Sequence, residues 1–219
     1  MKKEAVIFDM DGVISDTQKF HAEAESQLLA QYFDIRLSAE DITTRFAGVA
    51  DEKMFEEILK ENGIGSELKK IDGVVREKWD VMFNLIDEQL EPIPFAKELI
   101  SELSQAKIKL AVASTSTHKF IERVLNLLNV NSYFQVIVSA SDVVNGKPAP
   151  DIFLHASSLL DVEPNKCVVI EDGISGMKGA NSAGMKSIGL FPKKDSSIYP
   201  ATLLVTSLKE VNLDLIHEL

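Results

Sequence analysis

Six short apolar runs, separated by segments with helical spacing, constrain the fold of this chain more than any other feature. The runs are Ala5–Phe8, Leu110–Ala113, Val136–Val138, Val168–Ile170, Ser187–Leu190 and Leu203–Val205. Their length and their content of branched and aromatic residues suit strands that are buried on both faces. Between them, apolar residues recur at helical spacing, for example at Ala96, Leu99, Ile100 and Leu103. This alternation predicts an α/β fold with a parallel sheet and helices on both of its faces.

Residues 16–91 interrupt the alternation of strands and helices. The helical patterns in this interval are Phe20–Tyr32, Glu52–Leu59 and Ile71–Ile86, and it contains no convincing strand. Pro92 and Pro94 mark its end, because proline cannot continue a helix. We therefore expect an α/β core of residues 1–15 and 92–219, with a helical domain of residues 16–91 inserted after the first strand.

The composition excludes several classes of function. With 219 residues and a formal net charge of -11, the chain should repel phosphate backbones and anionic headgroups, so we expect no nucleic-acid or membrane partner. No apolar run approaches the roughly 18 residues needed to span a bilayer, and the one that ends at Asp9 is too short for a secretory signal. Cys167 is the only cysteine, which excludes an internal disulfide framework and suits a buried strand. We expect a cytoplasmic monomer or small homo-oligomer.

Polar residues follow four of the predicted strands. The four segments are Asp9-Met10-Asp11-Gly12, Ala113-Ser114-Thr115-Ser116, Asn145-Gly146-Lys147-Pro148-Ala149-Pro150-Asp151 and Glu171-Asp172-Gly173. Each has an ordinary alternative interpretation: a turn, a helix cap, a solvated lysine or a solvated strand end. In open parallel sheets, however, ligands bind at the carboxyl ends of the strands, so all four segments should meet at one edge. Together they supply the groups of a metal-assisted phosphoryl-transfer site.

The spacing within these segments indicates what the groups can do. Asp9 and Asp11 are two apart on an extended chain, which places both carboxylates on one side, suited to a divalent cation or to acid/base chemistry. The prolines around Lys147 fix the direction of an ammonium that could balance a phosphoryl group. Glu171 and Asp172 leave an apolar strand together and need compensation by a metal ion or a cation.

With these residues the chain resembles the haloacid dehalogenase superfamily, and within it the phosphatases and β-phosphoglucomutases that carry a small helical cap. The matching motifs are Asp9-x-Asp11-Gly12-Val13, Ser114, Lys147 in Gly-Lys-Pro-Ala-Pro-Asp, and Glu171-Asp172 followed by Gly173-x-x-Gly176. The resemblance implies a Rossmann-like parallel-sheet core with an inserted α-helical cap. Gly173, Gly176 and Gly179 lack the spacing of a dinucleotide fingerprint, and we expect them to allow close helix packing.

The resemblance also implies a catalytic role for four residues. Asp9 would attack phosphorus and form an aspartyl-phosphate, which splits one difficult displacement into two. Asp11 would protonate the leaving oxygen and later deprotonate the second acceptor. Ser114 and Lys147 would hold the phosphoryl oxygens in the transition state. A dehalogenase is disfavoured, because that branch attacks carbon and needs neither the second aspartate nor a metal ion.

The cofactor that the resemblance implies is Mg²⁺. Its ligands would be the Asp9 carboxylate, the backbone carbonyl of Asp11, Asp172, and Glu171 directly or through water. The ion would relieve the repulsion between Asp9 and the incoming phosphate.

Substrate choice should depend on the helical insert, together with the hydroxyl residues of the second loop. The candidate substrate-binding residues are Thr17, His21, Gly48, Asp51, Arg76, Thr115 and Ser116. In the mutases an arginine follows the Gly-Val of the cap loop, whereas Asp51 stands close behind Gly48-Val49 here. A carboxylate there would repel a bisphosphorylated intermediate by about 1 to 4 kcal/mol at 4 Å. This favours a phosphatase that acts on a small phosphorylated metabolite such as a sugar phosphate.

Two other functions stay open at this point. A β-phosphoglucomutase-type enzyme is the first alternative, if Arg45, Lys53 or Arg76 supplies the missing charge. The second is a non-catalytic phospho-ligand-binding protein that keeps the fold. That alternative is disfavoured, because such a protein would be free to lose Asp9 or Lys147 and this chain has both.

Overall fold

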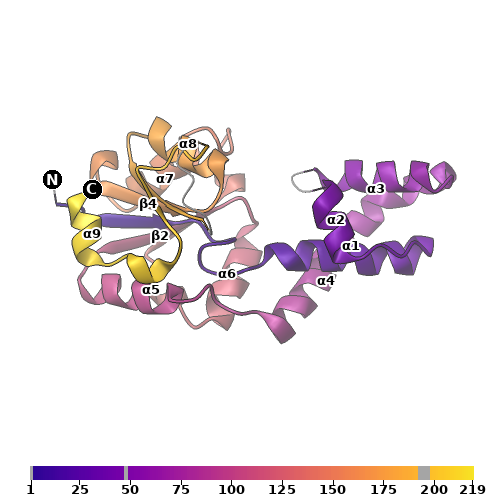
Figure 1. The fold of residues 1–219 in the computed structure, drawn as a ribbon, viewed down its shortest axis with the longest axis horizontal. Coiled ribbons are helices and arrows are strands. Elements are labelled where there is room, and N and C mark those ends of the chain that lie inside the picture. The colour runs from indigo at the N-terminus through magenta and orange to yellow at the C-terminus, as the bar shows by residue number, and fades with distance from the viewer. Residues whose placement is uncertain (1, 47–48, 192–197) are drawn as a thin grey trace. The chain divides into compact units, whose positions relative to one another are not determined.

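The chain forms two compact units in the computed structural model, which describes residues 2–46, 49–191 and 198–219 (Figure 1). One unit, which we call the core, comprises Met1–Asp16 and Leu90–Leu219. The other, which we call the cap, is Thr17–Gln89. No helix of the described residues is long and apolar enough to cross a membrane.

The core is built on a parallel sheet of six strands in the order β3-β2-β1-β4-β5-β6. The strands are β1 (Ala5–Phe8), β2 (Lys109–Ser114), β3 (Val136–Ser139), β4 (Cys167–Glu171), β5 (Lys186–Leu190) and β6 (Leu203–Val205). The predicted parallel α/β fold is confirmed. β1 lies in the centre with all four residues fully buried, and successive strands are added outward on either side of it. The strand order therefore reverses beside β1, which is where open sheets of this kind bind ligands.

Helices cover both faces of the sheet. They are α5 (Ala96–Gln105), α6 (His118–Leu127), α7 (Asp151–Leu159), α8 (Ile174–Ser182) and α9 (Leu213–Glu218). Figure 1 shows α7 and α8 on one face and α5 and α9 on the other. Short 3-10 helices connect some of these elements, at Asn131–Tyr133, Ala140–Asp142, Pro164–Lys166 and Leu208–Glu210.

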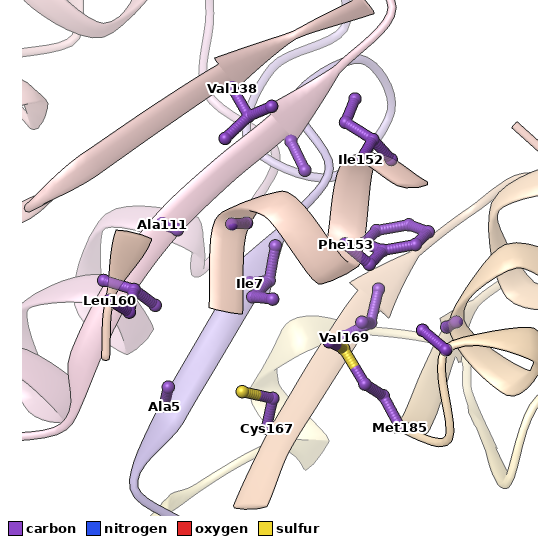
Figure 2. Close-up of a cluster of buried hydrophobic side chains, with 14 of the residues drawn as sticks. Ala5, Ile7, Ala111, Val138, Ile152, Phe153, Leu160, Cys167, Val169 and Met185 are labelled. Carbon is purple, nitrogen blue, oxygen red and sulfur yellow. The ribbon is translucent and has the colours of Figure 1, made fainter. Parts of the chain in front are cut away.

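A buried apolar cluster joins α7 and α8 to the sheet (Figure 2). Alternate residues of the strands point into it, among them Ile7 of β1 and Val169 of β4, and Phe153 of α7 packs against them. Cys167 belongs to the same cluster and is fully buried, as expected for a small apolar residue on a strand. This packing fixes the three central strands, and with them the polar loops that follow their carboxyl ends.

The cap is helical throughout its described residues. Its helices are α1 (Gln18–Phe33), α2 (Ala39–Phe46), α3 (Asp51–Glu61) and α4 (Ile71–Gln89), with a 3-10 helix at Gly65–Lys70. The cap has a hydrophobic cluster of its own, in which Leu28 and Leu29 of α1 pack with Phe55, Ile58 and Leu59 of α3. The residues that precede and follow the cap lie side by side: Ser15 forms an antiparallel bridge with Pro92, and the Ile93 N–H donates to the Ile14 carbonyl at 2.9 Å.

Candidate active site

A buried lysine links the carboxyl ends of the three central strands. The Lys147 ammonium donates to Asp9 Oδ1 at 2.5 Å, to Glu171 Oε1 at 2.8 Å and to the Ala113 carbonyl at 3.1 Å. The side chains of Lys147, Asp9 and Glu171 are only 5%, 9% and 4% exposed. Burial alone would lower the pKa of Lys147, but the two carboxylates raise it above its ordinary value. Lys147 is therefore a fixed cation at the centre of this site.

Asp9 owes its position to the sheet. It directly follows β1, and its N–H donates to the Ile170 carbonyl at 2.9 Å, which continues the pairing of β1 with β4. Burial raises the pKa of Asp9 well above its ordinary value, and Glu171 and Asp11 act in the same direction, whereas Lys147 opposes them. One lysine thus offsets only part of the negative charge around Asp9.

The second aspartate is held by the hydroxyl loop after β2. Asp11 Oδ2 accepts hydrogen bonds from Ser114 Oγ at 3.2 Å and from Ser116 Oγ at 3.1 Å. Burial raises the pKa of Asp11, while the two serine hydroxyls act against this. Thr115, between the two serines, is exposed. Ser139 at the end of β3 supports the loop by donating its hydroxyl to the Ser116 carbonyl at 2.8 Å.

Three carboxylates converge beside Lys147. Asp9, Glu171 and Asp172 each offer an oxygen within 4.8 Å of the others. Gly12, with a φ of +86°, leaves room for Asp172, since a Cβ at this position would lie 2.1 Å from Asp172 Oδ2. Burial raises the pKa of Asp172 to about 6, and Glu171 contributes to the shift.

This cluster fits a divalent cation. Clustered carboxylate oxygens are the donors that hard ions such as Mg²⁺ and Ca²⁺ take, and three carboxylates outnumber the single lysine beside them. The Asp11 side chain is not part of the cluster. The ligand that the family resemblance assigns to Asp11 is its backbone carbonyl.

Two glycines of α8, Gly176 and Gly179, have different roles. Gly179 allows close packing as expected, since a Cβ there would lie 3.1 Å from the Ala149 carbonyl oxygen and from the Phe153 ring. At Gly176 the expectation of helix packing was incomplete, because a Cβ there would lie 1.7 Å from Glu171 Oε1. Gly176 therefore makes room for a carboxylate of the site. The sequence analysis did not identify this role, nor the support from Ser139.

The cap contains a cavity of about 410 Å³ that includes two of the candidate substrate-binding residues. It is lined by Gln18, Lys19, His21, Ala22, Glu25, Ile42, Thr43, Phe46, Val49 and Asp51. Thr17 is fully buried where α1 begins, and Arg76 is exposed on α4; neither is among these lining residues. Gly48 lies outside the described residues.

Asp51 has a buried partner that the sequence analysis missed. Lys78 is 1% exposed and donates to Asp51 Oδ1 at 2.8 Å and to Glu25 Oε1 at 2.5 Å. One signal was present in the sequence: Lys78 lies four residues from both Val74 and Met82 on the apolar face of α4. No side-chain spacing could have identified Glu25 and Asp51, on two other helices, as its partners.

The three cationic residues considered as replacements for a cap arginine, Arg45, Lys53 and Arg76, do not line the cap cavity. Arg45 pairs with Glu61 at 2.6 Å on an exposed part of the cap, and Lys53 lines a different surface hollow. Arg76 is exposed, and none of the three lines the cavity.

His21 is uncharged at neutral pH. Burial lowers its pKa to about 4, and the nearby Lys78 ammonium adds to this, whereas Asp51 opposes it. Its ring meets Trp79 edge-on with 6.2 Å between the ring centroids. A neutral imidazole can both donate and accept one hydrogen bond.

Comparison with known proteins decides the family. Residues 6–190 match the family model described as haloacid dehalogenase-like hydrolase. The chain belongs to this family. The resemblance seen in the motifs is thereby confirmed, and the chain is an enzyme of the haloacid dehalogenase-like type, a family that generally uses a divalent metal ion.

Three relatives of this haloacid dehalogenase-like enzyme illustrate the range of the family. It is 33% identical over 224 residues to a β-phosphoglucomutase of Bacillus subtilis, covering 98% of this chain and 94% of the relative. It is 36% identical over 186 residues to a phosphorylated carbohydrates phosphatase of Thermotoga maritima, covering 84% and 83%. Among solved structures, a CbbY mutant from Rhodobacter sphaeroides in complex with xylulose-(1,5)bisphosphate aligns with a TM-score of 0.77 and 25% identity, covering 95% and 96%.

Proposed function

We propose that this enzyme is a Mg²⁺-dependent phosphatase that hydrolyses a phosphorylated sugar through a phosphoaspartate formed on Asp9. The observation that carries the proposal is the buried group of Asp9, Lys147 and Glu171, with Asp172 close by and Asp11 two residues after Asp9. The Thermotoga maritima relative, a phosphatase of phosphorylated carbohydrates, supports the choice of substrate class.

Asp9 is suited to attack phosphorus because its direction is fixed. Lys147 holds Oδ1 at 2.5 Å, which leaves Oδ2 as the oxygen that bonds to phosphorus. The backbone of Asp9 is hydrogen-bonded to β4, so the carboxylate is aimed before substrate binds. A nucleophile held in this way needs little reorganisation in the transition state.

Asp11 is placed to act as acid and then as base. In the first half-reaction it gives a proton to the alcohol oxygen that leaves phosphorus, and in the second it takes a proton from the attacking water. The Ser114 and Ser116 hydroxyls keep its carboxyl group on the side of the hydroxyl loop. Ser114 also offers a hydroxyl to a phosphoryl oxygen, and Lys147 offers a positive charge.

A bound divalent ion would be held by Asp9, Glu171 and Asp172, and would supply positive charge against the phosphoryl oxygens. The carboxylates of these residues are already close together, as such an ion requires.

A sugar phosphomutase is the second candidate, favoured by 33% identity to a β-phosphoglucomutase along 98% of this chain. The two reactions differ in the acceptor of the second half-reaction, which is water for the phosphatase and a sugar hydroxyl for the mutase. We favour the phosphatase because Glu25 and Asp51 line the cap cavity, where Lys19 is the one lysine or arginine among the described lining residues, so the balance of charge there disfavours a distal phosphate.

The test is a phosphate-release screen over sugar phosphates and other small phosphomonoesters, with Mg²⁺ and then with a chelator. We expect release from one class of sugar monophosphates that needs Mg²⁺ and is lost in Asp9→Asn. Asp161→Asn is the matched control, because it makes the same change at an exposed residue and should leave the rate unaltered. Release that survives Asp9→Asn would refute the assignment. Conversion of β-glucose 1-phosphate to glucose 6-phosphate with a bisphosphate primer, without net release, would make the enzyme a mutase.

A further inference from the structure

Ser116, in the hydroxyl loop after β2, has each of its polar groups in a hydrogen bond. Its N–H donates to Ser114 Oγ at 3.1 Å, its hydroxyl donates to Asp11 Oδ2 at 3.1 Å, and its carbonyl accepts from Ser139 Oγ at 2.8 Å. Ser116 is 8% exposed and Ser139 is 1% exposed, so water has little access to replace these bonds. The position from which Ser116 reaches Asp11 therefore depends in part on Ser139, at the end of the neighbouring strand.

The hydroxyl of Ser139 has one direction open to its proton. A hydroxyl has one donor and two acceptor lone pairs. Ser139 Oγ accepts from the Ser141 N–H at 3.3 Å and from Ser141 Oγ at 3.1 Å, which leaves its proton for the Ser116 carbonyl. In addition, β3 is an edge strand of the sheet, and Ser139 pairs in register with Ser114 of β2. Ser139 is therefore attached to the hydroxyl loop through the pairing of β3 with β2 and through its own side chain.

Asp142 fixes the backbone of Ser139. Its Oδ2 accepts from the Ser139 N–H at 2.8 Å, and His118 Nε2 lies 2.7 Å from the same oxygen. Burial alone would raise the pKa of Asp142, but these two hydrogen bonds lower it below its ordinary value, so the carboxyl group is ionised at neutral pH. An ionised carboxylate has no donor, so His118 Nε2 donates in this bond. Because His118 is the first residue of α6, Asp142 also holds the chain just beyond the hydroxyl loop.

We propose that Ser139 and Asp142 are positioning residues for Asp11. They hold Ser116, and through it the Asp11 carboxyl group, where Asp11 can protonate the alcohol oxygen that leaves phosphorus. In that step an Asp9 oxygen bonds to phosphorus, the bond from phosphorus to the alcohol oxygen breaks, and the proton of Asp11 goes to the alcohol. Both residues act through Ser116, so neither needs to contact the substrate. This inference rests on the proposed function, because it assigns residues to the acid step of that reaction.

The leaving group distinguishes positioning from simple stabilisation. An alcohol oxygen is strongly basic and needs a proton as it leaves, whereas p-nitrophenolate is a weakly basic anion that can leave without one. A variant that misplaces Asp11 therefore loses more activity with an alcohol leaving group than with p-nitrophenolate. If Ser139 and Asp142 only stabilised the core, both substrates would lose activity to the same extent.

The experiment compares Ser139→Ala and Asp142→Asn with two matched controls. Ser157→Ala also removes a buried hydroxyl of the core, one that is 2% exposed and donates to the Leu154 carbonyl at 3.0 Å within α7. Asp161→Asn makes the change of Asp142→Asn at another exposed residue. For each protein we would measure kcat/KM for the best sugar monophosphate from the release screen and for p-nitrophenyl phosphate. This parameter covers the half-reaction in which the alcohol leaves.

We expect Ser139→Ala to lower the ratio of kcat/KM for the sugar monophosphate to that for p-nitrophenyl phosphate by about tenfold, the effect of one buried hydrogen bond. Asp142→Asn should lower it by about threefold, because an amide oxygen accepts more weakly than a carboxylate oxygen. Both controls should keep the wild-type ratio. An unaltered ratio in either variant would overturn the role given to that residue. If Ser139→Ala does not fold, Ser139→Cys carries the same expectation, since a thiol is only a weak donor.

Failure of the proposed function would give a different pattern. Turnover that survives Asp9→Asn, or a wild-type ratio in Asp11→Asn, would refute the proposed reaction whatever the two positioning variants do. The support of Ser116 would then be tested without turnover, by hydrogen exchange of its amide proton. Exchange about tenfold faster in Ser139→Ala than in Ser157→Ala supports the positioning role, and equal exchange in the two variants overturns it.

Discussion

Replacing Gly176 by alanine should disrupt the candidate active site, although the glycine itself brings no side chain to it. An alanine Cβ would lie 1.7 Å from Oε1 and 2.1 Å from Cδ of Glu171, so the carboxylate must move away. Glu171 would then lose its bond from Lys147 at 2.8 Å and its bond from the Gly173 N–H at 2.6 Å. Lys147 would keep Asp9 as its only carboxylate partner among these groups.

One destabilising and two stabilising effects set the size of the change in stability. Breaking a buried ion pair costs about 3 to 5 kcal/mol, whereas alanine in place of glycine inside a helix contributes about 1 kcal/mol of stability. Relief of the repulsion between Glu171 and its acidic neighbours reduces the loss further. We therefore expect Gly176→Ala to lower the free energy of unfolding by about 2 kcal/mol, opposite in sign to the effect of helix propensity alone.

The assay is urea unfolding of the two proteins, with phosphate release measured on the same preparations. Gly73→Ala in α4 is the matched control, since Gly73 is exposed and nothing lies within 4 Å of an added Cβ. It should raise stability by up to about 1 kcal/mol and leave the rate of release unaltered. If Gly176→Ala is as stable and as active as the wild type, the role given to Gly176 is wrong.

Three further predictions concern Cys167, His21 and the candidate metal site. Burial raises the pKa of the Cys167 thiol to about 11, so iodoacetamide at pH 8 should label it only as the protein unfolds; prompt labelling in native buffer would contradict this. The pKa of His21 is lowered from 6.5 to about 4, so the unfolded chain takes up a proton in this window and the folded chain does not, and stability falls as the pH falls. Urea titrations at pH 7 and pH 4 should therefore show that His21→Gln removes about 3 kcal/mol of this loss, and an equal loss in both proteins would refute it. Mg²⁺ at 100 times its dissociation constant should stabilise the enzyme by about 2.7 kcal/mol in thermal unfolding, and an undiminished effect in Asp172→Asn would exclude that residue as a ligand.

The sheet could be predicted from the sequence because each strand is a short apolar run. All six predicted runs coincide with strands, since strands buried on both faces leave little choice of residue type. The helix at Ala39–Phe46 was not predicted, because only Ile42 and Phe46 are buried and the segment has no longer apolar stripe. The helix at Ile174–Ser182 contains two glycines, whose low helix propensity weakens the local helical signal. Both positions lack room for a side chain, because a Cβ there would meet neighbouring groups.

The candidate site was predictable where it depends on strand ends, and not where it depends on tertiary pairing. The rule that strand ends meet at one edge of a sheet brought Asp9, Lys147 and Glu171 into one prediction, and the structure places their side chains in contact. The partnership of Lys78 with Glu25 joins helices whose packing no local pattern encodes. Sequence periodicity identifies the buried face of a helix. Only the three-dimensional packing shows which residue of another helix neutralises a charge on that face.

The short bridge between Ser15 and Pro92 bears on how this fold could have evolved. Backbone hydrogen bonding within the core holds the two ends of the cap segment together, so the whole cap is a single insertion between two neighbouring points of the core. A recombination event could exchange that insertion for another without shifting the strand that precedes Asp9. The two compact units can therefore be inherited separately, and one lineage can keep the strand that precedes Asp9 while the inserted helices change.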